Sequence, residues 1–137
     1  MNKDIREIVA KVKEFKLAMN NVSGIDNEVI FPYERGASKY WDIREDLVEY
    51  MKMLDFETIK ELKILMYVGR DYYMAYTIEG FRPEYYRDNI TGLEIYSMEK
   101  KGLDDLGWGD KSKEINQMVS KAPLGEYLER GLEILIG

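Results

Sequence analysis

The stretch that decides the fold lies near the end of the sequence: Pro123-Leu124-Gly125-Glu126-Tyr127-Leu128-Glu129-Arg130-Gly131-Leu132. Its large apolar residues, continued by one more beyond the stretch, recur at spacings of three and four: Leu124, Tyr127, Leu128, Leu132 and Leu135. This spacing is typical of the buried stripe of an amphipathic helix. Pro123 suits the first turn of such a helix and ends the helix before it, because proline lacks a backbone N–H.

Gly131 lies in the interior of this predicted helix. A glycine there costs about 1 kcal/mol relative to alanine, so its presence calls for a structural reason. We predict that Gly131 marks the close approach of another helix rather than a ligand contact.

The same periodicity occurs in other parts of the chain, at residues 3–19, between Trp41 and Leu54, and after Asp55, which suits a helix N-cap. Asp110 or Ser112 suits the cap of a further helix, and residues 25–38 and 102–109 are predicted loops rich in glycine or proline. Alternating strand patterns are absent from the sequence. We therefore predict an all-α fold of six or seven short helices, an orthogonal or irregular bundle forming one domain over residues 1–137.

The middle of the chain contains Gly69-Arg70-Asp71. Gly69 suits the end of a helix, and Arg70 places a cation at the negative end of that helix's dipole. Asp71 suits the cap of a following helix. A further helix is predicted from Arg82-Pro83 to Glu99, with a break at residues 89–92.

Two segments resemble motifs of a known family. Residues 62–71, Leu-Lys-Ile-Leu-Met-Tyr-Val-Gly-Arg-Asp, resemble the LMWLGRGD segment of an uncharacterised bacterial family of small helical domains, and residues 123–132 resemble its closing P-L…YL-x-x-GL motif. The resemblance covers roughly residues 61–132. It implies a helical fold and brings no assigned activity.

The composition excludes several classes of site. The 137 residues include neither Cys nor His, which excludes disulfides, thiol nucleophiles, Cys/His zinc sites and imidazole bases. The 26 acidic residues outnumber the 20 basic ones, and a net charge of −6 disfavours nucleic-acid binding. Carboxylates spaced for one helix face, such as Asp42, Glu45 and Glu49, are interpreted as solvated surface rather than a Mg²⁺ site. We predict no cofactor, no metal and no catalytic residue.

The chain contains no uninterrupted apolar segment long enough for a secretion signal or a membrane span. We therefore predict a cytoplasmic protein. Basic residues interleave with acidic ones in the first segment, which predicts a solvated mixed-charge helix face: Lys3, Arg6, Lys11, Lys13 and Lys16.

Tyrosine placement is the most unusual feature, because seven of the eleven tyrosines fall between Tyr67 and Tyr96 and mix with arginines. Tyr and Arg are enriched at protein interfaces, since each combines apolar area with hydrogen-bonding groups. The predicted interface comprises Tyr72, Tyr73, Tyr76, Arg82, Tyr85, Tyr86 and Arg87. The alternative is a tyrosine-rich edge of the core.

Together these features favour a non-enzymatic helical module that acts through protein–protein contacts or self-association, with a homodimer as one form. One alternative is a small ligand-binding or Mg²⁺-dependent enzyme domain with a carboxylate and arginine pocket. Another is an acidic immunity or anti-defence inhibitor from a mobile element.

Overall fold

The computed structural model describes residues 1–23, 37–77 and 90–136, and gives only the backbone for residues 23, 37–38 and 73–77. This part contains six helices and no strand: α1 (Ile5–Ser23), α2 (Ala37–Lys52), α3 (Phe56–Thr77), α4 (Gly92–Leu106), α5 (Lys111–Val119) and α6 (Leu124–Ile136). The predicted all-α fold is confirmed.

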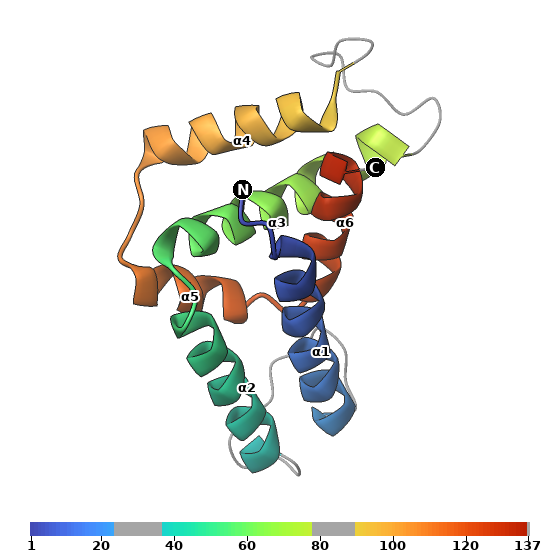
Figure 1. The fold of residues 1–137 in the computed structure, drawn as a ribbon. Helices are drawn as coiled ribbons and strands as arrows, with labels where there is room; N and C mark the ends of the chain where they lie inside the picture. Colours follow the sequence, from blue (N-terminus) through green and yellow to red (C-terminus); the bar gives the residue numbers. More distant parts are fainter. Residues whose placement is uncertain (24–36, 78–89, 137) are drawn as a thin grey trace.

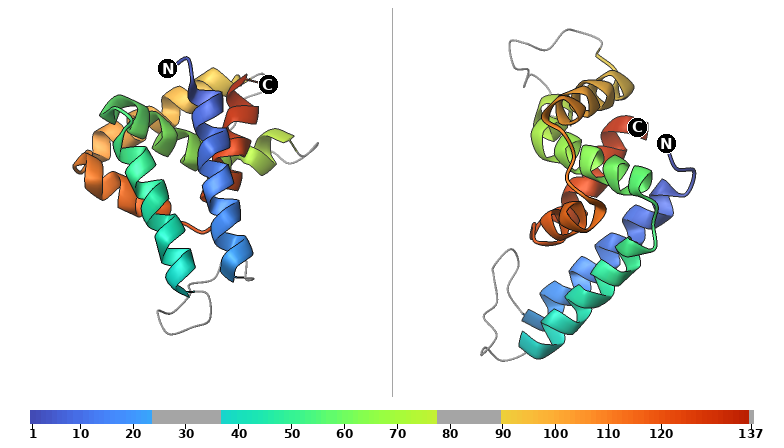
Figure 2. Two further views of the ribbon diagram at one scale, coloured as in Figure 1. Left: turned by 60° about the horizontal axis from the view of Figure 1, so that its bottom comes forward. Right: turned by 90° about the vertical axis from the view of Figure 1, so that its left-hand side faces the viewer.

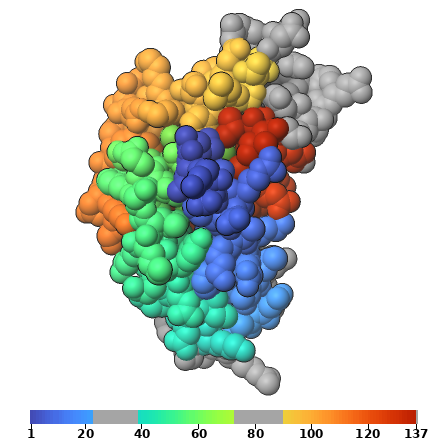
Figure 3. Space-filling view, in the orientation of Figure 1, coloured from blue at the N-terminus to red at the C-terminus, as the bar shows by residue number. Residues whose placement is uncertain are grey.

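The helices form an irregular bundle around α3 and α6 (Figure 1). α1 and α2 lie side by side and run in opposite directions, and both views of Figure 2 show them as one pair beside the other four helices. α5 packs against α2 and α3, while α4 lies across α3 and α6. On the face shown in Figure 3, α1 (blue) lies between α2 and α3 (green) on one side and α6 (red) on the other.

One continuous core joins all six helices. Its fully buried side chains come from each of them, for example Val12, Leu47, Leu62, Ile95, Ile115 and Leu128. The apolar stripes predicted in the first and last helices face this core. α3 is buried on nearly every side between Ile59 and Gly69, as expected of a helix whose apolar residues surround its axis.

α3 and α6 cross with their backbones in contact. A Cβ atom built on Gly131 would lie 2.2 Å from the Leu65 carbonyl oxygen, and one built on Gly69 would lie 1.8 Å from the Tyr127 carbonyl oxygen. Only glycine permits this approach, so the predicted close helix packing at Gly131 is confirmed.

Two further glycines bring α6 close to other helices. A Cβ on Gly92, at the start of α4, would lie 2.0 Å from the Ile134 carbonyl oxygen, and one on Gly125 would lie 3.3 Å from the Lys13 Cα. α6 is therefore approached closely by α1, α3 and α4.

The predicted helix end at Gly69 is wrong. α3 continues through Gly69, Arg70 and Asp71 to Thr77, so Arg70 is not at a helix terminus and Asp71 is not a cap. The reason is that Gly69 serves the approach of α6 rather than a left-handed turn. Gly102 likewise lies inside α4, which continues to Leu106. The first part of the loop predicted at residues 102–109 is therefore helical.

The predicted caps agree better with the structure. The Asp55 and Asp110 carboxylates accept hydrogen bonds from the backbone N–H groups of Thr58 and Lys113, each at 2.8 Å, so Asp110 and not Ser112 caps α5. Pro123 directly precedes α6, and its carbonyl accepts the Tyr127 N–H at 3.0 Å. Thr91, within the predicted break at residues 89–92, caps α4, and the helix predicted before that break lies outside the described residues.

Replacing either glycine of the crossing by alanine should force α3 and α6 apart. We expect Gly69→Ala and Gly131→Ala each to lower the free energy of unfolding by about 2–4 kcal/mol in urea titrations. The matched control is Gly102→Ala, in α4, whose Cβ would meet nothing within 4 Å. It should raise stability by about 0.5–1 kcal/mol through helix propensity. Equal effects at all three positions would contradict the backbone contact.

Candidate functional site

The predicted tyrosine and arginine interface lies mostly outside the described residues. This applies to Arg82, Tyr85, Tyr86, Arg87 and the side chains of Tyr73 and Tyr76. Tyr72 is described, is half-buried and packs against the core. Whether the set forms an interface therefore stays a prediction.

The other described tyrosines of that segment also lie against the core. Tyr67 is half-buried, and the Arg70 guanidinium lies 4.4 Å from its ring centroid. Tyr96 is buried, and burial raises the pKa of its hydroxyl, as do the nearby carboxylates of Glu61 and Asp104. These two side chains match the alternative of a tyrosine-rich core edge.

Arg70 and Asp71 form a surface ion pair on α3, with Nε–Oδ1 at 2.7 Å and Nη2–Oδ2 at 3.1 Å. Glu99 of α4 is nearby. Partial burial and the Asp71 charge raise the pKa of the Glu99 carboxyl, and the Arg70 charge opposes that rise. The charges of Arg70 and Asp71 therefore act on Glu99 of the neighbouring helix.

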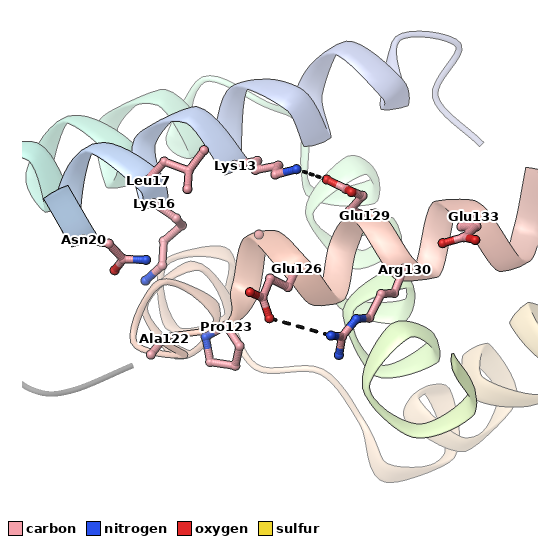
Figure 4. Close-up of a pocket in the computed structure, with 11 residues that line it drawn as sticks. Lys13, Lys16, Leu17, Asn20, Ala122, Pro123, Glu126, Glu129, Arg130 and Glu133 are labelled. Carbon is pink, nitrogen blue, oxygen red and sulfur yellow. Dashed lines mark hydrogen bonds and ion pairs between the residues drawn. The ribbon is translucent and has the colours of Figure 1, made fainter. Parts of the chain in front are cut away.

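The strongest candidate site is a groove between α1 and α6, with a volume of about 370 Å³ (Figure 4). Its apolar side chains are Leu17, Ala122 and Pro123. Around them are three cations and three carboxylates: Lys13, Lys16, Arg130, Glu126, Glu129 and Glu133. We call this feature the α1–α6 groove.

Ion pairs connect several of these charges. Lys13 of α1 pairs with Glu129 of α6, and Arg130 Nη2 lies 3.9 Å from the Glu126 Oε2 within α6. The first pair bridges the two helices, as the dashed line in Figure 4 shows. The side chains of both pairs are well exposed, so each contributes little to stability.

Lys16 differs from the other charges in the groove, because only 5% of its surface is exposed. Its ammonium donates a hydrogen bond to the Val119 carbonyl, the last residue of α5, at 3.1 Å. Burial, helped by the Arg44 charge, lowers the pKa of Lys16 from 10.5 to about 8. Perturbed pKa values of this kind are concentrated at functional sites.

The expectation that Lys16 belongs to a solvated face is therefore wrong. Lys16 lies four residues after Val12 and three before Met19, both fully buried, so it occupies the apolar stripe of α1. This spacing is the signal that identifies it in the sequence.

A second buried charge lies between α3 and α5. The Lys63 ammonium is 2.5 Å from the Glu114 carboxylate, which also accepts the Gly109 N–H at 3.0 Å. The Trp108 ring centroid lies 5.3 Å from the Lys63 Nζ. Every charge here has a partner, so we interpret this cluster as a structural contact that fixes α5 and the segment before it on α3.

A second groove, of about 450 Å³, lies between α3 and α4 and is lined by Ile64, Leu93, Tyr96 and Trp108 among others. Its polar groups also bond to one another. The Trp108 indole N–H and the Lys100 ammonium both donate to Asp104, each at 2.8 Å, and this lowers the pKa of the Asp104 carboxyl.

Among the described residues, no group of three or more acidic side chains is placed to hold a metal ion. No helix in the same part of the chain has the length and apolar character to cross a membrane.

Comparison with protein-family models, curated proteins and solved structures finds no match to this chain. The resemblance to the uncharacterised helical family therefore stays a prediction.

Lys16 should make stability depend on pH in a specific direction. The unfolded chain keeps the Lys16 proton up to about pH 10.5 and the folded chain loses it near pH 8, so the unfolded state binds more protons between these values. The Lys16 titration should therefore increase the free energy of unfolding as pH rises from about 8 to about 10.5. Lys16→Met should remove that increase.

At pH 7 the same variant should be more stable than the wild type by about 1–2 kcal/mol, because the cost of the buried charge exceeds that of the lost hydrogen bond. Urea titrations at pH 7 and pH 10 measure both effects. A variant that is less stable at pH 7, with unchanged pH dependence, would contradict the burial of a costly charge.

Proposed function

We propose that this chain is a non-enzymatic helical module that acts by binding another protein, with the α1–α6 groove as part of the contact surface. The supporting observation is the lining of that groove, which combines the exposed Leu17 and the half-buried Ala122 and Pro123 with a rim of both charge signs. Protein interfaces commonly have an apolar centre and a polar rim.

Two properties of the groove favour a polypeptide partner over a small apolar ligand. Leu17 is 51% exposed and Glu126, Glu129 and Glu133 are all exposed, so the groove is open to solvent along α6. Small-molecule sites are more enclosed and mainly apolar. The charged rim suits selection among partners, because charge complementarity contributes more to specificity than to affinity.

A second candidate function is a ligand-binding domain with a carboxylate and arginine pocket. The observation that favours it is the burial of Lys16 at the edge of the same groove. A cytoplasmic location and the homodimer remain proposals, and a second copy of this chain is one possible partner.

A charge swap within the groove tests the proposed function. Glu126→Arg combined with Arg130→Glu keeps both the net charge and the i,i+4 pair, while it reverses the charge pattern that a partner meets. The matched control is Lys101→Asp with Asp105→Lys, which swaps an exposed i,i+4 pair of α4 whose atoms lie 3.1 Å apart.

Tagged wild type and both swapped forms are purified from the native host and examined by native mass spectrometry. We expect a protein partner, or a second copy of the chain, bound to the wild type and the α4 control. In the groove swap the Kd should rise about tenfold, as expected for a cost near 1.4 kcal/mol, and the bound fraction should fall with it. Equal binding to all three forms, or a wild type without any protein partner, would contradict the proposal.

A further inference from the structure

Lys16 is a buried cation that lacks a counter-ion in the described part of the chain. Its ammonium has one hydrogen-bond acceptor, the Val119 carbonyl, and no carboxylate among the described residues forms an ion pair with it. Buried charges are normally paired, because the cost of removing them from water is otherwise too large. An ammonium has three N–H donors, so two remain for a further acceptor.

Other cations lie around Lys16. Arg44 of α2 is close enough to disfavour the Lys16 charge, and Lys13 and Arg130 line the same groove from α1 and α6. The two carboxylates nearest to these cations, Glu129 and Glu126, already pair with them. α5 contributes only the Val119 carbonyl to the ammonium.

Lys16 lines the groove although it is almost wholly buried. Figure 4 shows the side chain extending from α1 toward Ala122 and Pro123, with the Asn20 amide beside its tip. Leu17 lies on the same helix and contributes apolar surface. A cation beside apolar side chains suits a carboxylate carried on a short carbon chain.

We infer that the end of the α1–α6 groove at Lys16 and Asn20 is a binding site for a carboxylate group, with the Lys16 ammonium as its counter-ion. A singly charged group fits better than a phosphate, because Glu126, Glu129 and Glu133 line the same groove and repel a dianion. The carboxylate comes either from a free small acid or from an acidic residue of a bound protein. The second source deepens the proposed function and rests on it.

A bound carboxylate would favour the charged form of Lys16, so binding and protonation are linked. Nuclear magnetic resonance of the Lys16 Cε and its protons measures the lysine pKa directly. The probes are sodium acetate and an end-capped peptide with one glutamate, with sodium chloride at the same ionic strength as the control.

We expect saturating acetate, or the peptide, to raise the Lys16 pKa by about one unit. Such a rise means that the probe binds the neutral amine about tenfold more weakly than the charged ammonium. A response to acetate assigns the site to small acids as well as to peptides, and a response to the peptide alone assigns it to a protein segment. Lys101→Met should leave the response unchanged, and Lys16→Met should remove the acetate-dependent shifts of neighbouring signals.

The inference is overturned if neither probe shifts the Lys16 pKa, or if chloride shifts it equally. Its failure is separate from failure of the proposed function, because the charge swap at Glu126 and Arg130 tests protein binding without any small-acid probe.

Discussion

The backbone contact between α3 and α6 determines the arrangement of the other helices. At Gly69 and Gly131 no side chain separates the two helices, so they approach more closely than helices with ordinary side chains at the crossing. α4 starts at Gly92 against the end of α6, and α1 passes the first turn of α6 at Gly125. The orientation of α6 therefore fixes three of the five other helices, and a large side chain at the crossing would displace all of them.

α6 also forms one side of the α1–α6 groove. Since Leu128 and Gly131 face the core, the opposite side of α6 presents Glu126, Glu129 and Glu133 to solvent. α1 lies alongside, held by Gly125 against Lys13, so its stripe points Lys16 toward the end of α5. Lys16 is buried although its burial opposes folding. Sites kept at a cost to stability are often functional, and this is the physical basis for proposing the groove as a binding surface.

Periodicity and caps made most of the fold predictable. The stripes of α1 and α6, the caps Asp55 and Asp110, and the close packing at Gly131 follow from local rules that the structure obeys. The role of Gly69 was not predictable, because glycine suits both a helix end and the close approach of another helix. Which of the two applies depends on α6, which is distant in the sequence. The burial of Lys16 follows from its place in the stripe, but its isolation from carboxylates depends on how α2, α5 and α6 surround it.

The account depends most on the direct contact of two backbones, and a nuclear Overhauser effect measures that contact without any mutation. The Gly69 Cβ position lies 2.8 Å from the Gly131 amide nitrogen, so the Gly69 α-protons and the Gly131 amide proton should be close neighbours. We expect a strong cross-peak between them. Its absence, in a sample where the sequential contacts of α3 and α6 show both helices formed, would contradict the crossing and the arrangement of helices around it.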